Sequence, residues 1–395
     1  MFKVRIFNSI SAAGLARFPQ TDYDVSENHL DPDALILRSY DLHAETFGPA
    51  LKAVGRAGVG VNNIPIEVMS QRGIPVFNAP GANANAVKEL FIAGMLLAAR
   101  NICPAWDYVR QLDFSAADVE AKVEQAKHQF AGFELPGRTL GVIGLGAIGV
   151  LVSKAALGLG MRVIGYDPQI TVRSAWQLDA SVEQATSVSD LLSRSDVVTL
   201  HVPYNDKTHG LLNENNFGRM QQGATLINFS RGGIVDTAAL KSALDAGRLH
   251  AYVSDFPSAE LGVHPRIIAL PHIGASTQEA QDNSAVMVAN QICDFLEAGN
   301  IVNSVNFPEV RLAPMGGYRI ALVNANVPNM VGQISTRLAE AGLNIIEMLN
   351  RSRGEYAYTL IDVETRPSAE LISTLSAIQG VITVRPLTLS TANGQ

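Results

Sequence analysis

The sequence predicts an α/β fold, and three observations lead to this prediction. Apolar, strand-like runs alternate with helical stretches over most of the chain, a glycine-rich turn joins one strand to a helix, and an acidic residue ends the next strand. Such alternation is typical of parallel strands connected by helices. Because 395 residues exceed what one hydrophobic core normally serves, two or three domains are expected.

The glycine-rich turn lies within Gly141 to Gly149 and follows the predicted strand Thr139 to Ile143. Gly144 permits the sharp turn, and Gly146 lets the backbone approach a pyrophosphate without a side chain in the way. Gly149 allows the following helix to pack closely on the strand. The pattern therefore predicts a dinucleotide-binding turn.

The helix and strand that follow support this prediction. The N–H groups of Ala147 and Ile148, at the helix start, are expected to receive the phosphate oxygens. A second strand, Met161 to Tyr166, leads to Asp167, which lies roughly 20 residues beyond Gly144. A carboxylate at this offset hydrogen-bonds the adenosine ribose and repels the 2′-phosphate of NADP, so we expect a Rossmann domain that binds NAD rather than a purely structural βαβ unit.

The first hundred residues are predicted to form a smaller α/β unit of their own. Its expected strands are Phe2 to Phe7, Ala34 to Arg38, Leu51 to Val54 and Pro75 to Phe77, and its expected helices include Ile66 to Gln71 and Ala86 to Ala99.

Three polar turns of this unit indicate a ligand-binding face. They are Arg38-Ser39, Arg56 to Gly60 and Asn78 to Gly81, and each follows a strand, where ligands approach an open α/β sheet. Arginine binds carboxylate or phosphate bidentately, and glycine exposes backbone N–H groups to an anion. The candidate substrate contacts are Arg38, Ser39, Arg56, Gly58, Val59 and Gly60.

A polar helical stretch, Ala105 to Pro136, interrupts the alternation. Two interpretations stay open: a solvated connector, or a helical arm exchanged between subunits, which would account for its apolar residues Trp106, Tyr108, Leu112 and Phe114. The alternation then continues from Thr139 as one doubly wound sheet. Its further strands are expected at Val197 to Val202, Ala224 to Phe229, Ala251 to Asp255 and Ile267 to Leu270.

A long helix is expected from Thr277 to Ala298, and a linker from Phe307 to Gly317. The last part of the chain has the order strand, helix, strand, strand, helix, strand, which suits a small open-faced βαββαβ sandwich. These elements are expected at Arg319 to Val323, Val331 to Ala341, Asn344 to Asn350, Ala357 to Val363, Ala369 to Ala377 and Val381 to Pro386. This part has no cluster of nucleophile, base and acid, so we expect the catalytic chemistry elsewhere.

Composition excludes several classes of function. A formal charge of −7 argues against a general nucleic-acid or anionic-membrane surface. Cys103 and Cys293 lack metal-ligand spacing and are expected to be free thiols of a reducing compartment. Met1 to Phe7 alternates like a strand rather than a signal peptide, and the most apolar run, Leu90 to Ala99, is shorter than the about 20 residues that a bilayer requires. We therefore expect a cytoplasmic protein with no metal and with neither nucleic acid nor membrane as a partner.

Three isolated charged residues follow strands of the central sheet: Arg231, Glu260 and His272. Oxidation of a 2-hydroxy acid by hydride transfer needs a cation to orient the carboxylate, an imidazole to take the hydroxyl proton, and a carboxylate to hold that imidazole. His201, within a strand, and His264, in an apparent loop, are the competing histidines.

The glycine turn with Asp167, the run Asn228 to Asp236 and the run Pro271 to Ala280 resemble the D-isomer-specific 2-hydroxyacid dehydrogenases, over nearly the whole length. The resemblance implies a discontinuous, flavodoxin-like substrate domain formed by residues 1–99 and 276–310. It also implies an inserted Rossmann NAD domain over residues 100–275, with 100–136 as the helical arm, and a regulatory domain over residues 317–395.

The same resemblance assigns roles to individual residues. The catalytic residues fall on Arg231, Glu260 and His272, and Asn83 joins the substrate contacts. Asp255 is placed near the nicotinamide amide; it keeps the family's spacing to Glu260, although the segment from Glu260 to His272 is short. The implied cofactor contacts are Gly144, Gly146, Ala147, Ile148, Gly149, Asp167, Pro203, Phe229, Ser230, Asp255, Gly274 and Ala275.

The resemblance thus predicts NAD-dependent oxidation of 3-phosphoglycerate or a related small 2-hydroxy acid by a homodimer or homotetramer. Two alternatives remain. One is a reductase for hydroxypyruvate or another 2-oxo acid. The other is an NAD-sensing, corepressor-like binding protein.

The C-terminal unit resembles an ACT domain, a ferredoxin-like module that binds amino acids where two sheets pair. Asn326 and Pro328 match its first-turn motif, whereas Asn329 replaces the usual glycine. Asn324 stands where serine-inhibited relatives have a histidine, and Asn344 matches the partner asparagine from the facing subunit. The expected regulatory residues are therefore Asn324, Asn326 and Asn344, with L-serine as the expected ligand.

Overall fold

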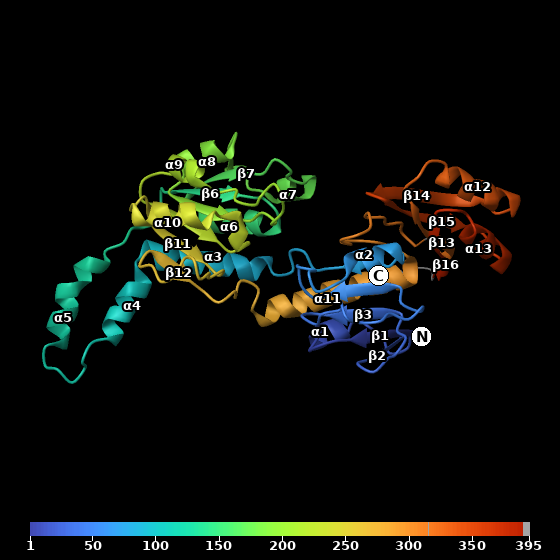
Figure 1. Cartoon of the computed structure of the whole chain (residues 1–395), viewed down its shortest axis with the longest axis horizontal. Coiled ribbons are helices and arrows are strands. Elements are labelled where there is room, and N and C mark those ends of the chain that lie inside the picture. The colour runs from blue at the N-terminus through green and yellow to red at the C-terminus, as the bar shows by residue number, and fades with distance from the viewer. Residues whose placement is uncertain (315, 390–395) are drawn as a thin grey trace. The chain divides into compact units, whose positions relative to one another are not determined.

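The computed structural model describes residues 1–314 and 316–389, and it divides into two compact units (Figure 1). The central unit is Asn83–Thr277, and the discontinuous unit joins Met1–Ala82 to Gln278–Gln395. The end of the predicted regulatory domain, residues 390–395, lies outside the described residues.

The central unit is built on a seven-stranded parallel sheet in the order β12-β11-β10-β9-β6-β7-β8. Residues of β6, β9 and β10 are buried on both faces, as parallel strands covered by helices require. The strands are β6 (Thr139–Ile143), β7 (Arg162–Tyr166), β8 (Glu183–Gln184), β9 (Val197–Leu200), β10 (Ala224–Asn228), β11 (Leu249–Ser254) and β12 (Ile267–Ala269). The chain reverses direction across the sheet between β6 and β9, so the ligand crevice is expected at the carboxyl ends of these two strands.

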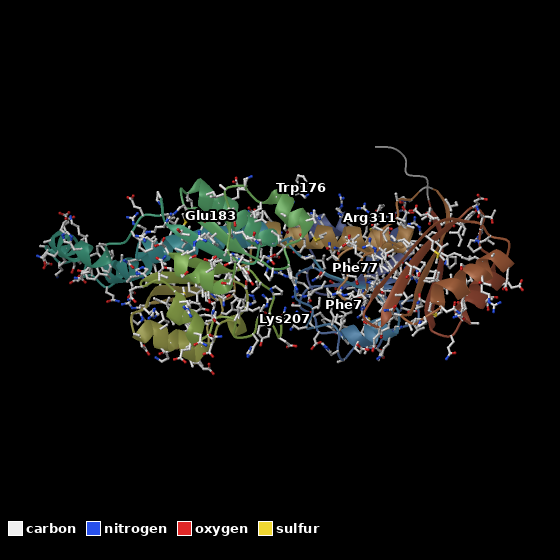
Figure 2. All side chains as sticks on the ribbon, turned by 90° about the horizontal axis from the view of Figure 1, so that it is seen from above. Phe7, Phe77, Trp176, Glu183, Lys207 and Arg311 are labelled. Atoms are coloured by element: carbon white, nitrogen blue, oxygen red, sulfur yellow. The ribbon has the colours of Figure 1, made fainter. Side chains whose placement is uncertain are left out.

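Helices connect the strands and cover the sheet. They are α3 (Ala84–Ala99), α6 (Ala147–Gly158), α7 (Val172–Gln177), α8 (Val188–Arg194), α9 (Glu214–Arg219) and α10 (Thr237–Asp245), with the 3₁₀ turn η2 (Gly232–Ile234) after β10. The apolar run predicted at Leu90 to Ala99 is part of α3, whose Phe91 and Met95 are buried in the core. Trp176, labelled in Figure 2, is by contrast 85% exposed on α7.

A helical hairpin projects from the rest of the central unit (Figure 1). It consists of α4 (Ile102–Arg110), α5 (Val119–Ala126) and the 3₁₀ turn η1 (Lys127–Phe130). The rings of Tyr108 and Phe130 lie 5.5 Å apart and join its two arms. Trp106 and Phe114 remain 60% and 70% exposed, so the hairpin leaves large apolar side chains uncovered within the chain.

The discontinuous unit contains a parallel sheet in the flavodoxin-like order β2-β1-β3-β4-β5. Its elements are β1 (Phe2–Ile6), α1 (Ala12–Leu15), β2 (Tyr23–Ser26), β3 (Ala34–Leu37), β4 (Ala53–Arg56), α2 (Ile66–Gln71) and β5 (Val76–Phe77). Sequence reasoning missed α1 and β2, and it placed β4 two residues too early, so that Arg56 ends the strand instead of following it. Phe7 and Phe77, labelled in Figure 2, belong to the cores on the two faces of this sheet.

The C-terminal part of this unit is a βαββαβ fold with an antiparallel sheet in the order β14-β15-β13-β16. Its elements are β13 (Gly317–Ala325), α12 (Met330–Glu340), β14 (Ile345–Arg353), β15 (Tyr356–Val363), α13 (Ala369–Ser376) and β16 (Val381–Leu389). Ile320 and Leu322 of β13 pack with residues of α12 and α13. Their neighbours Ala321 and Val323 point to the other face and pack in the core that contains Phe77.

This second face of the sheet is therefore not open, as the sequence predicted, but covered. The core against it includes Val288, Ile292 and Phe295 of α11 (Gln278–Ala298). Arg319 of β13 is fully buried, forms an ion pair with Asp362 of β15, and donates hydrogen bonds to carbonyl groups that include that of Ala298.

The linker predicted from Phe307 to Gly317 was wrong for its first half. Phe307, Val310 and Leu312 are buried in the same core, and Val310 pairs with Ile301 in an isolated bridge. Burial of these apolar side chains makes the segment part of the packing.

Candidate active site

The three glycines of the turn after β6 have three different physical reasons to be glycine. Gly144 has a φ of +96°, and a Cβ there would lie 2.5 Å from the carbonyl oxygen of His201. A Cβ on Gly149 would lie 2.0 Å from the carbonyl oxygen of Gly144. Gly146, by contrast, has no atom within 4 Å of its Cβ position, so its side faces open space. That open space is what a pyrophosphate needs for close approach to the backbone.

Helix α6 begins directly behind this space. Its N-cap is Gly146, and no side chain caps the helix. The first N–H groups, including those of Ala147 and Ile148, are therefore available to an anion, and the helix dipole favours negative charge there.

Asp167 follows β7 and is fixed by two backbone groups. Its carboxylate accepts a hydrogen bond from the Leu145 N–H at 2.9 Å and another from the Gln169 N–H at 2.9 Å. The first of these bonds ties the acid to the glycine turn itself. Since an ionised carboxylate accepts about four hydrogen bonds, Asp167 retains acceptor positions for a ribose hydroxyl.

Asp255 joins the end of β11 to the segment that carries His272. It is 1% exposed, and its Oδ2 accepts a hydrogen bond from the Gly274 N–H at 2.9 Å. Its carbonyl oxygen accepts another from the His272 N–H at 2.9 Å. The remaining carboxylate oxygen, Oδ1, is buried with no hydrogen-bond partner among the described residues. An unpartnered buried acceptor is costly, and the carboxamide N–H of a nicotinamide would satisfy it.

His272 is held in an uncommon backbone conformation at the surface. Its φ is +48°, in the left-handed region that a residue with a Cβ seldom adopts, and such outliers cluster at functional sites. Its ring packs against Phe256 with centroids 4.8 Å apart, and its side chain makes no hydrogen bond with the described residues. The imidazole is therefore available to a ligand.

The two competing histidines are engaged elsewhere. The ring of His201 lies 3.0 Å from the Thr199 hydroxyl, and burial lowers the pKa of His201 to about 3, so it is neutral and a poor base near neutral pH. His264 accepts a hydrogen bond from the Arg266 N–H and lies 3.4 Å from the carboxylate of Asp245. Of these three histidines, His272 fits the role of a proton acceptor best.

The turn after β10 presents Arg231, whose side chain is exposed and donates to the Ser230 carbonyl at 2.7 Å. Asn228, which sequence reasoning passed over, shapes this turn. Its buried amide accepts from the Ser230 N–H at 3.1 Å and donates to the Arg231 carbonyl at 2.9 Å. The signal was present, because an asparagine that ends a strand commonly bonds the backbone of the following turn.

For the other predicted residues of the central unit, the structure gives less support for a role in the site. Glu260 lies in an exposed turn, and the structure records no hydrogen bond or ion pair between it and His272 among the described residues. The side chain of Phe229 is buried in the core, so only its backbone is available to a cofactor. Pro203 is exposed beyond β9, and the buried Oδ1 of Asn83 lacks a partner among the described residues.

The predicted anion-binding turns lie in the discontinuous unit, at the carboxyl ends of the neighbouring strands β3, β4 and β5. Arg56 Nε donates to the Arg38 carbonyl at 3.0 Å, and Arg38 Nη1 donates to Gln281 of α11 at 2.8 Å. A Cβ on Gly58 would lie 2.5 Å from Arg56 Nη1, so the glycine makes room for the guanidinium. Ser39 and Val59 are exposed beside them. The structure thus brings the two arginines together.

The predicted regulatory asparagines serve mainly the local structure of one chain. Asn324 is 1% exposed, and Asn326 donates to the Gly354 carbonyl at 3.0 Å. Asn326 and Asn344 are both exposed. Asn329 has a φ of +65°, so the position requires the left-handed conformation that glycine or asparagine adopts most readily.

Neither a metal-binding cluster nor a membrane-spanning helix is found among the residues that the structure describes. No three or more His, Cys, Asp or Glu side chains are grouped so as to hold a metal ion. None of the helices combines the length and apolar character needed to cross a membrane.

The known proteins that this chain resembles are 2-hydroxyacid dehydrogenases. Residues 92–274 match the D-isomer specific 2-hydroxyacid dehydrogenase NAD-binding domain. The D-3-phosphoglycerate dehydrogenase of Haemophilus influenzae is 34% identical over 392 residues, covering 93% of this chain and 92% of that protein. That of Methanocaldococcus jannaschii is 36% identical over 341 residues, or 83% of this chain, which spans 62% of that relative's length. An NAD⁺-bound 3-phosphoglycerate dehydrogenase structure from Entamoeba histolytica is similar with a TM-score of 0.59 at 26% identity, covering 77% of this chain and 98% of that one.

Proposed function

We propose that this chain, which belongs to the D-isomer-specific 2-hydroxyacid dehydrogenase family, oxidises 3-phospho-D-glycerate to 3-phosphohydroxypyruvate with NAD. This reaction is the first step of the phosphorylated route to L-serine. One observation of the site carries the proposal: the backbone of Asp255 holds the segment of the exposed His272, while its buried Oδ1 lacks a partner that a nicotinamide amide would supply. Asp255 would thus position both the catalytic base and the nicotinamide of the cofactor.

The side chains divide the chemistry as follows. NAD, held by the turn after β6 and by Asp167, would supply the hydride acceptor for this oxidation. His272 takes the proton of the 2-hydroxyl group, and Arg231 orients the carboxylate and stabilises the developing carbonyl oxygen. Glu260, which lies in an exposed turn and has no recorded hydrogen bond or ion pair with His272 among the described residues, pairs with the imidazolium of His272 once substrate is bound.

The phosphate of the substrate is assigned to the polar turns of the discontinuous unit. Arg38 and Arg56, which the fold brings together, are the groups that can bind it bidentately. Ser39 completes this assignment, and residues 58–60 and Asn83 are proposed as further substrate contacts. The proposed domains are residues 1–99 with 276–310 for substrate, 100–275 for NAD and 317–395 for regulation, and the structure groups the helix α3 with the central unit.

The proposed function is tested by following NADH absorbance with a panel of 2-hydroxy and 2-oxo acids, phosphorylated and not. We expect turnover to be highest with the 3-phosphoglycerate and 3-phosphohydroxypyruvate pair. Preference for unphosphorylated hydroxypyruvate would identify a reductase instead. NAD binding without turnover of any compound would indicate a sensor protein.

Asp167 is expected to set the affinity and the selectivity for the cofactor. In Asp167→Ala the bonds to the ribose are lost, and the affinity for NAD should fall by about 10- to 100-fold, as expected for loss of a charged hydrogen bond. Discrimination against NADP should relax, because the repelling carboxylate is gone. NAD and NADP dissociation constants measured by fluorescence titration check this, with Asp206→Ala, an exposed acid of the same unit, as the control. An unchanged NADP to NAD ratio would remove Asp167 from the site.

We propose that the βαββαβ part is an ACT domain through which L-serine inhibits the enzyme. The support is its strand order and the exposed Asn344, which is available to a ligand shared with a second copy. Inhibition requires that serine bind one state of the enzyme better than another, because equal affinity shifts no equilibrium.

Serine titrated against NADH-linked activity should therefore inhibit the full-length protein, and Asn344→Ala should raise the half-inhibitory concentration by about tenfold. Asn350→Ala, on the following strand, is the matched control. Activity unaffected by millimolar serine would leave the ACT domain with another ligand or with an assembly role.

We propose that the protein works as a homodimer or homotetramer in the cytoplasm, with the α4–α5 hairpin exchanged between subunits. The exposed apolar side chains Trp106 and Phe114 support this, because their burial against a second copy would remove apolar surface from water. Light scattering would give a monomer mass if the hairpin were only a solvated connector.

A further inference from the structure

A cavity of about 350 Å³ lies between the sheet of the βαββαβ part and the N-terminal part of the discontinuous unit. Strand residues such as Val323 and Tyr358 line one side, and Phe295 of α11 lines another. The N-terminal part contributes residues from Pro49 to Ile74. The cavity shares no lining residue with the polar turns after β3 and β4.

Three of the residues that line this cavity are cations: Lys52, Arg72 and Arg385. Among the described residues that line it, none is acidic. The carboxylate of Asp33 forms an ion pair with Lys52 from outside the lining. Asp33 is thus paired with Lys52, and the three like charges that line this partly open cavity repel one another.

Arg385 is the least satisfied of the three. Its Nη2 donates to the carbonyl groups of Phe295 and Leu296 at the end of α11, at 3.2 and 3.1 Å, and its guanidinium lies 4.3 Å from the Phe295 ring centroid. Its Nη1 is buried and has no hydrogen-bond partner among the described residues. Burial lowers the pKa of Arg385, while the hydroxyl group of Tyr358 and the charge of Asp33 act in the opposite direction.

The other two cations are held in place but keep donors to spare. Lys52 Nζ donates to Asp33 and to the Ala50 carbonyl, which leaves one of its three N–H groups. Arg72 donates through Nη1 to the Phe47 carbonyl at 3.1 Å and through Nη2 to the Gly48 carbonyl at 2.6 Å. A guanidinium has five N–H donors, so Arg72 also retains some.

We propose that this cavity binds a small oxyanion, a carboxylate or phosphate compound, between Arg385, Arg72 and Lys52. Two guanidinium groups and an ammonium group provide charge-assisted hydrogen bonds, and the apolar walls suit a compact carbon skeleton. The volume is that of a metabolite-sized ligand. Such a ligand contacts β16 and the N-terminal part at once, so it stabilises the packing of the sheet against that part.

The test is calorimetric titration of the full-length protein with sodium phosphate and, separately, sodium malonate at constant ionic strength. All titrations use an Arg38→Gln background, so that the proposed substrate-phosphate face does not contribute. We expect one site per chain, with the preferred probe distinguishing a phosphate from a carboxylate ligand. Arg385→Gln should weaken binding by about tenfold or more, whereas Arg366→Gln, an exposed arginine before α13, should leave it unchanged.

Because Arg385 also holds the end of α11, thermal unfolding of Arg385→Gln is measured alongside. If that variant does not fold, Lys52→Gln decides the question with the same expected loss. Absence of binding of both probes at millimolar concentration overturns the proposal. So does equal weakening by Arg366→Gln, which would mean that the anions bind only through general surface charge.

Discussion

Replacing His272 by asparagine is expected to lower kcat by about 10²- to 10⁴-fold, the range that general base catalysis contributes. Asparagine is the suitable replacement because it tolerates the left-handed backbone at φ +48°, where alanine would add strain. The N–H bond to the Asp255 carbonyl is retained, so the dissociation constant of NAD should change little. Steady-state kinetics together with fluorescence titration of NAD separate the two effects.

His264→Asn and His201→Asn are the controls for this result. Burial lowers the pKa of His201 to about 3, so that ring stays neutral above this pH and cannot produce a titration limb near neutrality. Turnover should therefore stay near normal in both controls. Near-normal turnover of His272→Asn would show that another group is the catalytic base.

Replacing Gly149 by alanine is expected to abolish NAD binding at concentrations that saturate the unaltered protein. The new Cβ would lie 2.0 Å from the carbonyl oxygen of Gly144, a backbone atom that cannot rotate away. Helix α6 must then move from β6, which displaces the N–H groups at its start and costs about 1–3 kcal/mol or more in stability. Calorimetric titration of NAD and thermal unfolding measure both consequences.

Two glycines of the same helix region are matched controls. Gly146→Ala adds a Cβ in open space, so the fold should keep its stability, while NAD affinity falls because the methyl group occupies the pyrophosphate position. Gly158→Ala also meets nothing within 4 Å and should leave NAD binding unchanged. A Gly149→Ala variant that binds NAD like Gly158→Ala would refute the packing role of Gly149.

The sequence by itself determined the features that depend on neighbours along the chain. The turn at Gly144 to Gly149, the position of Asp167 after β7 and the order of helices and strands along the C-terminal part follow from local turn chemistry and from the period of apolar residues. The residues that form each of these patterns lie close together along the chain, so the patterns can be recognised in a single sequence. The same is true of β6, whose bounds agree with the prediction from Thr139 to Ile143.

Only the tertiary structure decided which faces and groups meet across the chain. It covered the second face of the C-terminal sheet with α11, and it buried Phe307 in a segment predicted to be a linker. It also left the Oδ1 of Asp255 and the Nη1 of Arg385 without hydrogen-bond partners among the described residues. The partners of a sheet face or a buried polar atom come from residues far away in sequence, and packing selects among many apolar surfaces of similar pattern.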